Sequence, residues 1–348
     1  MKIAILTEPG LLDLLKKEIE EMGFKPQKKQ FFLELEESPK QILKIMYLSG
    51  LATNIITLDS FAEFKNKEDL LKKIKINPLK EKIKIECQRQ GKHDFNSQDI
   101  TKEISKKIVG SDYKDYENKA IIFIQNQNFV AGIDLVGKDL SKREYNIFIH
   151  PTNIKPTIAL AAYYLTSRKG AVLDPMSLSG VIPIEIALKK ARLSNSFYSK
   201  KFELTKLIED NYENLLEETD SKINKDLNVY SIDKNFKNLS NQKKNAKIAG
   251  VEKLIEFSKY SLRDIDLKHW KQKIEIVITK PIEPSKKISE KIALDFFETF
   301  QNQMKILKPK EIVFIMEKPQ ILEKTSFKPK QIIKTRQGQR ELNLVKIK

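Results

Sequence analysis

Apolar and polar residues along the first 61 positions alternate between the period of a strand and the period of a helix. The pattern predicts strands over residues 1–6, 30–35 and 51–61. Between them, apolar positions three and four residues apart predict helices over residues 11–22 and 39–48. This βαβαβ order is typical of a small α+β unit.

The pattern continues over residues 63–145 with a second set of elements. It predicts helices over residues 67–74 and 97–108, and strands over residues 83–89, 120–125 and 130–135. The last two strands are close enough in sequence to form a hairpin.

The third block opens with a short buried strand over residues 171–173 and a tight turn, followed by a helix that begins near Val181. Apolar residues surround this helix on every side, so it should be buried. A strand and turn that open a helix N-terminus can bind an anion or a nucleotide, because unpaired N–H groups point at the ligand. The same pattern also occurs in any α/β domain.

The α/β alternation then resumes after a charged helical insertion over residues 194–225. A strand ends at Asp233, and an acid in that place accepts the ribose hydroxyls of a nucleoside in dinucleotide folds. The later pattern predicts strands over residues 254–257, 274–278 and 311–316, a helix over residues 292–307, and a hairpin that turns at Gly338.

Charge is unevenly distributed over the chain, which carries a net charge of +17. Residues 1–150 hold 26 basic and 23 acidic residues, whereas residues 151–348 hold 38 and 24. Such an excess indicates a polyanion such as nucleic acid, although solvated lysines from a coding bias would give the same count. With Cys87 as the one cysteine, no apolar run of 18 residues and no signal peptide, we expect a cytoplasmic protein without disulfides or membrane contact.

Two motifs in the third block resemble those of a known family. Asp174, Pro175 and Gly180 lie in DPMSLSGVIPIEIA, which resembles the D-P-x-x-G-S-G-T-x-x-I-E-A motif of RNA methyltransferases that carry a THUMP domain. Residues 245–251 read NAKIAGV and are similar to the family's N-A-x-x-A-G-V run. In the second block, Gly91, His93 and the later GIDLVGKDLSKR look like a THUMP domain.

The resemblance implies an α/β chain in which a ferredoxin-like α+β domain and a THUMP domain precede a Rossmann-like, seven-stranded methyltransferase domain. We expect the ferredoxin-like domain at residues 1–62 and the THUMP domain at residues 63–147. A linker and first helix at residues 148–165 then lead to the methyltransferase domain at residues 166–348.

The family uses its THUMP domain to grip the acceptor end of transfer RNA, and the resemblance implies RNA, with transfer RNA favoured, as the partner here. The predicted RNA-binding residues are Lys92, His93, Ser97, Lys142, Arg143, Lys334, Arg336 and Arg340. His93 fits a structural hydrogen bond better than an RNA contact, and Ser97 is also expected to cap its helix. The basic residues of the last hairpin could equally protect an edge strand from aggregation.

The chain departs from the family where the chemistry takes place. Leu178 replaces the first glycine of the turn, and Ser261 stands where the family has an acid for the adenine amine. Lys280 and Pro281 begin a Lys-Pro-Ile-Glu run in place of Asn/Asp-Pro-Pro-Tyr. A charged lysine only donates hydrogen bonds, so Lys280 cannot accept one from the base amine that is methylated.

We therefore predict an RNA-binding protein that has lost methyl transfer, with Asp174, Pro175, Gly180 and Asp233 as vestigial cofactor residues. S-adenosylmethionine would be the cofactor if the chain is active, with none otherwise, and no metal is expected. The alternative is an active guanine-N2 methyltransferase with an atypical site. Thiouridine synthesis lacks support, because the sequence has no phosphate loop for ATP and no cysteine in its C-terminal half. Whether a protein partner supplies catalysis stays open.

Overall fold

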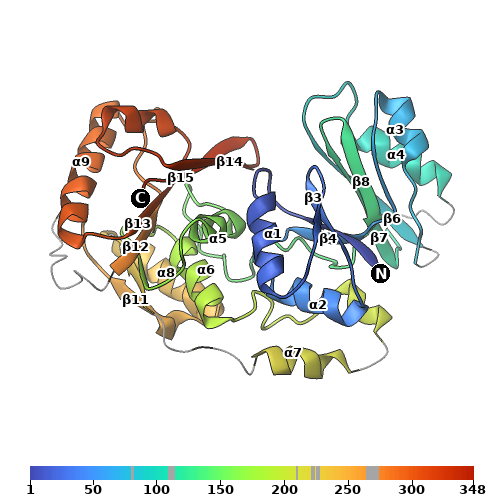
Figure 1. Ribbon diagram of the computed structural model, residues 1–348, viewed down its shortest axis with the longest axis horizontal. Coiled ribbons are helices and arrows are strands. Elements are labelled where there is room, and N and C mark those ends of the chain that lie inside the picture. Colours follow the sequence, from blue (N-terminus) through green and yellow to red (C-terminus); the bar gives the residue numbers. More distant parts are fainter. Residues whose placement is uncertain (80–81, 109–113, 209–210, 221–223, 225–227, 264–273) are drawn as a thin grey trace. The chain divides into compact units, whose positions relative to one another are not determined.

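The structure is a computed structural model that describes residues 1–348 except 80–81, 109–113, 209–210, 221–223, 225–227 and 264–273. Its contacts divide the chain into two compact units, whose elements are labelled in Figure 1. Unit 1 comprises Met1–Thr7, Leu15–Leu140 and Tyr198–Glu217. Unit 2 comprises Glu8–Leu14, Ser141–Phe197 and Glu218–Lys348.

The N-terminal part of the chain forms two four-stranded sheets, ordered β2-β3-β1-β4 and β5-β8-β7-β6. Its elements are β1 (Lys2–Leu6), α1 (Leu12–Glu21), β2 (Gln27–Lys28), β3 (Phe32–Glu36), α2 (Pro39–Leu48), β4 (Asn54–Thr57), β5 (Ser60–Glu63), α3 (Lys67–Lys73), β6 (Ile83–Gln90), α4 (Ser97–Lys107), β7 (Asn118–Gln125) and β8 (Asn128–Ile133).

The first sheet has the antiparallel pairing of a ferredoxin-like unit. β1 lies between β3 and β4, and Ile3 and Ile5 on β1 are fully buried. α2 begins after Ser38, whose side chain accepts a hydrogen bond from the Gln41 amide, with Pro39 in its first turn. The observed order is βαββαβ, because the short strand β2 precedes β3; the other elements follow the order predicted from the sequence.

The prediction of one strand over residues 51–61 was wrong, because the chain changes sheets there. β4 pairs with β1 in the first sheet, whereas β5 pairs with β8 in the second. The change occurs at Leu58 and Asp59, whose amides donate to Lys2 and Ala131 in different sheets. Gly132 permits the close approach, because a Cβ there would lie 1.7 Å from the Thr57 carbonyl oxygen.

The second sheet is mixed, with β6 parallel to β7 and β8 antiparallel to it. Its buried side includes Ile85 and Ile122, which share a core with Ile100 of α4. Asn96, and not Ser97 as predicted, caps α4: its side chain accepts from the Asp99 amide, and Asp99 accepts from the Asn96 amide. Ser97 is the first helical residue and lies close to the Cys87 thiol, whose pKa burial raises to about 12.

The predicted helical insertion over residues 194–225 is only partly helical among its described residues. It contains a short 3₁₀ helix, η1 (Glu203–Leu207), and the helix α7 (Tyr212–Asp220). The Leu204 amide donates to the Leu135 carbonyl, so this segment of unit 1 is tied to the loop that follows β8.

Unit 2 contains a seven-stranded sheet ordered β11-β10-β9-β12-β13-β15-β14. Its elements are α5 (Pro156–Tyr164), β9 (Ala171–Asp174), α6 (Val181–Ala191), β10 (Val229–Ile232), α8 (Phe236–Ile248), η2 (Glu252–Leu254), β11 (Ile255–Ser258), β12 (Ile274–Thr279), α9 (Glu290–Leu307), β13 (Glu311–Met316), η4 (Pro319–Lys324), β14 (Gln331–Gln337) and β15 (Arg340–Lys346). The strands β9 to β13 are parallel, and β14 and β15 form the antiparallel hairpin predicted to turn at Gly338.

The fold class predicted from the sequence is thus confirmed: a mixed α/β chain with a ferredoxin-like sheet, a THUMP-like sheet and a Rossmann-like, seven-stranded sheet. The RNA-binding role of the second sheet and the predicted bounds of the four segments remain predictions. Among the described helices, none combines the length and apolar composition needed to cross a bilayer.

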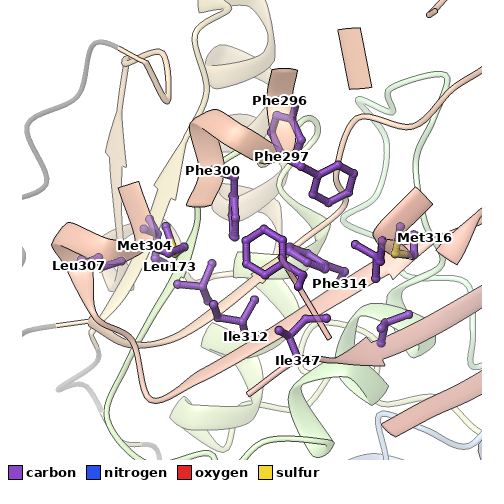
Figure 2. Packing of buried hydrophobic residues seen from close by; sticks show 14 of the residues in the cluster. Leu173, Phe296, Phe297, Phe300, Met304, Leu307, Ile312, Phe314, Met316 and Ile347 are labelled. Carbon is purple, nitrogen blue, oxygen red and sulfur yellow. The ribbon is translucent and has the colours of Figure 1, made fainter. Parts of the chain in front are cut away.

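Phenylalanine rings of α9 fill one side of the seven-stranded sheet (Figure 2). Phe300 lies edge-on to Phe314 of β13 with ring centroids 5.2 Å apart, and Phe327 lies 5.5 Å from Phe314. The apolar positions of α9 follow helical spacing, so one face of the helix is buried. Edge-to-face rings suit the aromatic quadrupole and fix α9 against β13.

Candidate active site

The order of the parallel strands reverses beside β9, which lies between β10 and β12. Ligands of open α/β sheets bind at this switch point, beyond the carboxyl ends of the strands. Asp174 ends β9, Asp233 follows β10 and Lys280 follows β12. The fold therefore brings three of the predicted site residues to one crevice, where Asp174 and Lys280 line a common cavity.

The turn after β9 keeps the conformation that glycine would favour. Leu178 has φ +52° and Gly180 has φ +83°, both in the left-handed region. Leucine is strained there, because its Cβ approaches the backbone. Gly180 also packs closely, since a Cβ there would lie 3.0 Å from Cγ of Gln242. The buried Pro175 and the bond from the Met176 amide to Asp174 Oδ1 complete the turn.

The carboxylate of Asp233 is occupied by the protein's own donors. Oδ2 accepts from the Leu178 amide at 3.0 Å and from Asn238 Nδ2 at 3.1 Å. Oδ1 accepts from the Asn235 amide at 2.8 Å and from Asn238 Nδ2 at 3.2 Å. Asp233 is only 4% exposed, so little of it is accessible to a ribose. The Leu178 amide thus donates to Asp233 Oδ2, an oxygen that would otherwise be an acceptor for a nucleoside hydroxyl.

A polar stripe on α8 holds this arrangement together. Gln242 is fully buried, donates to the Leu178 carbonyl oxygen and accepts from the Ser231 hydroxyl. Asn245 donates to the Ser179 carbonyl oxygen. Asn245 was predicted from its sequence motif, whereas Asn238 and Gln242 were missed. Their spacing of i, i+4 and i+7 puts all three on one helix face, and this spacing was the available signal.

Asp174 lies at the bottom of the crevice and is 1% exposed. Burial raises the pKa of its carboxyl to about 7, and the negative charge of Asp233 acts in the same direction. The hydrogen bond from the Met176 amide to Oδ1 opposes the shift by lowering the pKa. Around neutral pH both the protonated and the ionised form of this carboxyl are therefore populated.

Side chains and backbone leave little room in the crevice. The cavity lined by Asp174, Leu178, Val181 and Lys280 has a volume of about 10 Å³. That is space for roughly one water molecule, whereas ligand pockets are on the order of 300 Å³ or more. In this arrangement the described residues leave space for roughly one water molecule beside Asp174, and the carboxylate of Asp233 already accepts hydrogen bonds from the chain's own groups.

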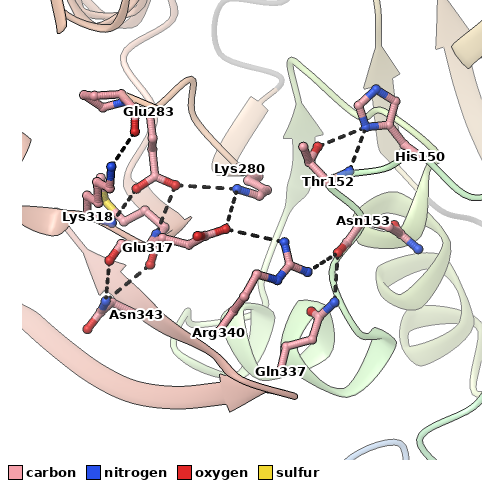
Figure 3. A network of polar contacts seen from close by, with 12 residues as sticks. His150, Thr152, Asn153, Lys280, Glu283, Glu317, Lys318, Gln337, Arg340 and Asn343 are labelled. Carbon is pink, nitrogen blue, oxygen red and sulfur yellow. Dashed lines mark hydrogen bonds and ion pairs between the residues drawn. The ribbon is translucent and has the colours of Figure 1, made fainter. Parts of the chain in front are cut away.

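Lys280 lies beside two carboxylates at the end of β12 (Figure 3). Its Nζ is 3.5 Å from Glu283 Oε2 and 3.9 Å from Glu317 Oε1, and the residue is 9% exposed. Glu283 also accepts from the amides of Glu317 and Lys318 at 3.0 and 2.6 Å. Glu283 thus binds the chain's own groups at the position where the family resemblance places a stacking ring.

The network continues to the last hairpin and to the linker before α5. Arg340 contacts Glu317 Oε1 at 3.5 Å and donates to the Asn153 carbonyl oxygen at 3.2 Å. Gln337 donates to the same oxygen at 3.0 Å, and its own side-chain oxygen accepts from the Lys155 amide. These bonds fix the linker against the hairpin (Figure 3). Arg340, predicted to contact phosphate, is engaged in this network.

The other predicted RNA-binding residues differ in exposure. Lys92, Lys142, Lys334 and Arg336 have exposed side chains that a phosphate could reach. Ser97 is partly buried at the start of α4.

Arg143 is buried, whereas a phosphate contact requires an accessible guanidinium. Its side chain is 2% exposed, and its Nε and Nη2 atoms donate to the two carboxylate oxygens of Glu185, each at 3.1 Å. Tyr145 donates to the same carboxylate at 2.8 Å. The prediction of Arg143 as an RNA contact is corrected accordingly, because a buried bidentate ion pair leaves the guanidinium inaccessible.

His93 makes contacts within the chain, in keeping with the structural hydrogen bond expected from the sequence. Its Nδ1 is 3.0 Å from Arg89 Nη1, and its Nε2 is 2.5 Å from the Asn126 carbonyl oxygen. Phe64 stacks on the ring and Phe95 packs beside it, with centroids 6.1 and 5.0 Å away. Within the described part of the chain, no three histidine, cysteine or carboxylate side chains are grouped to hold a metal ion.

The strand order, the switch-point crevice and the terminal hairpin define unit 2 as a Rossmann-like methyltransferase fold. Residues 143–345 match the family described as "RMKL-like, methyltransferase domain", and the chain belongs to this family. The chain is 32% identical to the tRNA (guanine(6)-N2)-methyltransferase of Methanocaldococcus jannaschii, over 74% of this chain and 75% of that protein. The enzyme of the same name from Archaeoglobus fulgidus is 26% identical, over 78% and 71%.

Solved structures share the fold at low sequence identity. The crystal structure of SMU.472 complexed with SAH superimposes with a TM-score of 0.80 at 17% identity, covering 99% of this chain and 97% of that chain. TrmN from Thermus thermophilus gives a TM-score of 0.67 at 16% identity, covering 99% and 98%. At these identities the similarity defines the fold alone.

Proposed function

We propose that this chain is an RNA-binding member of the RMKL-like family that no longer transfers methyl groups, with transfer RNA as its RNA. The observation that carries the proposal is the occupied carboxylate of Asp233. It accepts hydrogen bonds from Leu178, Asn235 and Asn238 beside a cavity of about 10 Å³. A cofactor would have to displace the turn after β9 before it could bind.

The altered residues after β12 support the loss of the reaction. A base amine needs a nearby acceptor to align it for methyl transfer, but the charged ammonium of Lys280 only donates. Glu283 and Glu317 contact that ammonium and stabilise its positive charge. Pro281 remains, but Ile282 and Glu283 replace the second proline and the aromatic ring implied by the family resemblance.

Charge and kinship support RNA as the partner. The net charge of +17 favours binding to a polyanion. Both relatives named above are tRNA methyltransferases. The exposed Lys92, Lys142, Lys334 and Arg336 are the candidate phosphate contacts, and we assign the grip on the acceptor end to a THUMP domain at residues 63–147.

The competing function is an active S-adenosylmethionine-dependent guanine-N2 methyltransferase, favoured by the 32% identity to an enzyme of that name. The test is incorporation of labelled methyl from S-adenosylmethionine into unmodified transfer RNA. We expect no turnover, and Lys280→Asn alone should not restore it because Ile282 and Glu283 still occupy the base site. Turnover by the unaltered protein that Asp174→Ala abolishes would establish the active enzyme.

Binding of transfer RNA tests the other half of the proposal. The affinity of the full chain should fall steeply between low and physiological salt, because each phosphate contact releases condensed counterions. Transfer RNA with its 3′ end intact should bind more tightly than RNA that lacks it. Salt-insensitive binding, or equal affinity for both RNAs, would contradict recognition of the acceptor end.

A further inference from the structure

The outward face of α8 carries an aromatic ring and lysines that the crevice does not use. Phe236, Lys243 and Lys247 lie at i, i+7 and i+11, so they share one helix face. At 100° per residue, this face is opposite the stripe of Asn238, Gln242 and Asn245 that holds the turn. The two faces therefore have separate roles.

These outward side chains border an open groove. Its volume is about 220 Å³, and Phe236, Lys243, Lys244 and Lys247 line it together with Glu252. The groove is about twenty times larger than the cavity of the crevice, whose volume is about 10 Å³. A flat ring-shaped group could enter it, which is not true of the crevice.

Phe236 is unusual for a phenylalanine, because 69% of its surface is exposed. Most rings of this chain that face the sheets are buried, as Phe300 and Phe314 are. Lys259 places its ammonium 6.0 Å from the centroid of the Phe236 ring. The ring therefore presents apolar surface to solvent with a cation beside it.

The charge of the groove is positive. Three lysines and one glutamate line it, and Lys259 adds a further positive charge beside Phe236. Lys244 lies 4.9 Å from the Phe148 ring centroid. Among the described residues, Lys243 and Lys247 have no carboxylate within ion-pair distance. Unneutralised lysines one helical turn apart suit successive phosphates of a nucleic acid strand.

We propose that this groove binds an unpaired nucleotide of single-stranded RNA, with its base stacked on Phe236 and its phosphates on Lys243 and Lys247. The proposal rests on the RNA-binding function proposed above and extends it to a second surface, separate from the crevice. An exposed ring beside unneutralised lysines is the combination that single-strand binding proteins use. An acidic peptide would need the charges but not the ring, so the ring distinguishes the two ligands.

Tryptophan fluorescence of the full chain can report on the groove directly. In Phe236→Trp the indole should be quenched when a short oligouridylate stacks on it. Ile292→Trp is the matched control, because Ile292 is also exposed, at 52%, in the first turn of α9. The unaltered protein, with Trp270 as its tryptophan, supplies the background. An acidic peptide of equal charge serves as the competing ligand.

We expect saturable quenching of Phe236→Trp by the RNA, no quenching of Ile292→Trp and no quenching by the peptide. When Lys243→Glu and Lys247→Glu are added to Phe236→Trp, binding of the RNA should weaken. The magnitude of the slope of log affinity against log salt should fall by roughly 1.4–1.8. The same charge changes at Lys291 and Lys305 on α9 should have little effect. Phe236→Ala should reduce affinity for transfer RNA on the order of tenfold.

The outcomes separate this proposal from the one on which it rests. If transfer RNA binds but Phe236→Trp is not quenched and Phe236→Ala binds normally, the groove proposal is overturned while the RNA-binding function stands. If the oligouridylate quenches Phe236→Trp but transfer RNA does not bind, the groove proposal stands and the assignment of transfer RNA as the partner in the proposed function fails. Equal quenching by RNA and peptide would overturn the nucleotide assignment.

Discussion

Two regions built on the same strands of unit 2 differ in what their side chains do. Beneath α9, Phe297, Phe300 and Phe314 form an apolar core that supports the sheet. Beyond the ends of β12 and β13, Lys280, Glu283 and their neighbours form a polar network (Figure 3). The core is what any protein of this fold needs. The network consists of bonds within the chain at the edge of the sheet where a ligand site is expected, so the same strands support an apolar core on one side and a polar network at their ends.

The largest expected effect is in the core. Phe314→Ala should lower the free energy of unfolding by about 3–5 kcal/mol, because Phe314 is fully buried and contacts three other rings. Phe236→Ala, at a 69% exposed ring, is the control and should change it by less than about 0.5 kcal/mol. Denaturant unfolding measures both. Equal losses would show that the core under α9 does not support the fold as described.

Because the buried carboxyl of Asp174 has a raised pKa, we expect the stability of the folded chain to depend on pH. The pKa of this carboxyl is raised from 3.8 to about 7 in the folded chain, so the folded state holds a proton that the unfolded state has lost. Stability should therefore fall as pH rises from about 4 to about 7, by up to about 4 kcal/mol for this group.

Asp174→Asn removes the titrating group and keeps the shape of the side chain. Unfolding of both proteins in denaturant, followed by circular dichroism from pH 4 to pH 8, gives the difference in stability. The free energy of unfolding of the variant, relative to that of the unaltered protein, should rise from pH 4 to pH 8. At pH 8 the variant should be the more stable of the two. A constant difference would mean that the carboxyl is not buried in the folded chain.

Substitution of Glu283 tests the polar network. It should lower the free energy of unfolding by less than Phe314→Ala does in the core. Glu283→Ala leaves Lys280 and the amides of Glu317 and Lys318 without this acceptor, which should cost about 2–3 kcal/mol. Glu283→Gln keeps an acceptor oxygen and should cost less. Glu290→Ala removes an exposed pair with Lys324 and should cost under about 1 kcal/mol. Equal effects of the two alanine variants would indicate that the network is not ordered.

The local pattern of apolar and polar residues was enough to predict the elements named next, which belong to the seven-stranded sheet and its helix α9. Helical spacing on α9, the strand that ends at Asp233 and the turn at Gly338 are all set by residues near in sequence. The change of sheet at Leu58 was missed, because it depends on Gly132 on a distant strand. A continuous apolar pattern carries no sign of such a break.

The site was predictable in its residue types but not in its contacts. The glycine replaced by Leu178 and the lysine at 280 are visible in the sequence, and both are at the predicted places. That the Leu178 amide bonds Asp233, or that Glu283 bonds two amides beyond β13, depends on loops separated by more than 30 residues. Arg143 was assigned to RNA for the same reason, since its partner Glu185 is 42 residues away.

Calorimetric titration of the purified full chain with S-adenosylmethionine tests the closed crevice most directly. The bonds of Asp233 and the small cavity predict no saturable heat at cofactor concentrations up to about 1 mM, which corresponds to a binding free energy weaker than about −4 kcal/mol. A dissociation constant in the micromolar range that Asp174→Ala abolishes would contradict the account, because the cofactor would then bind where the chain's own groups are found.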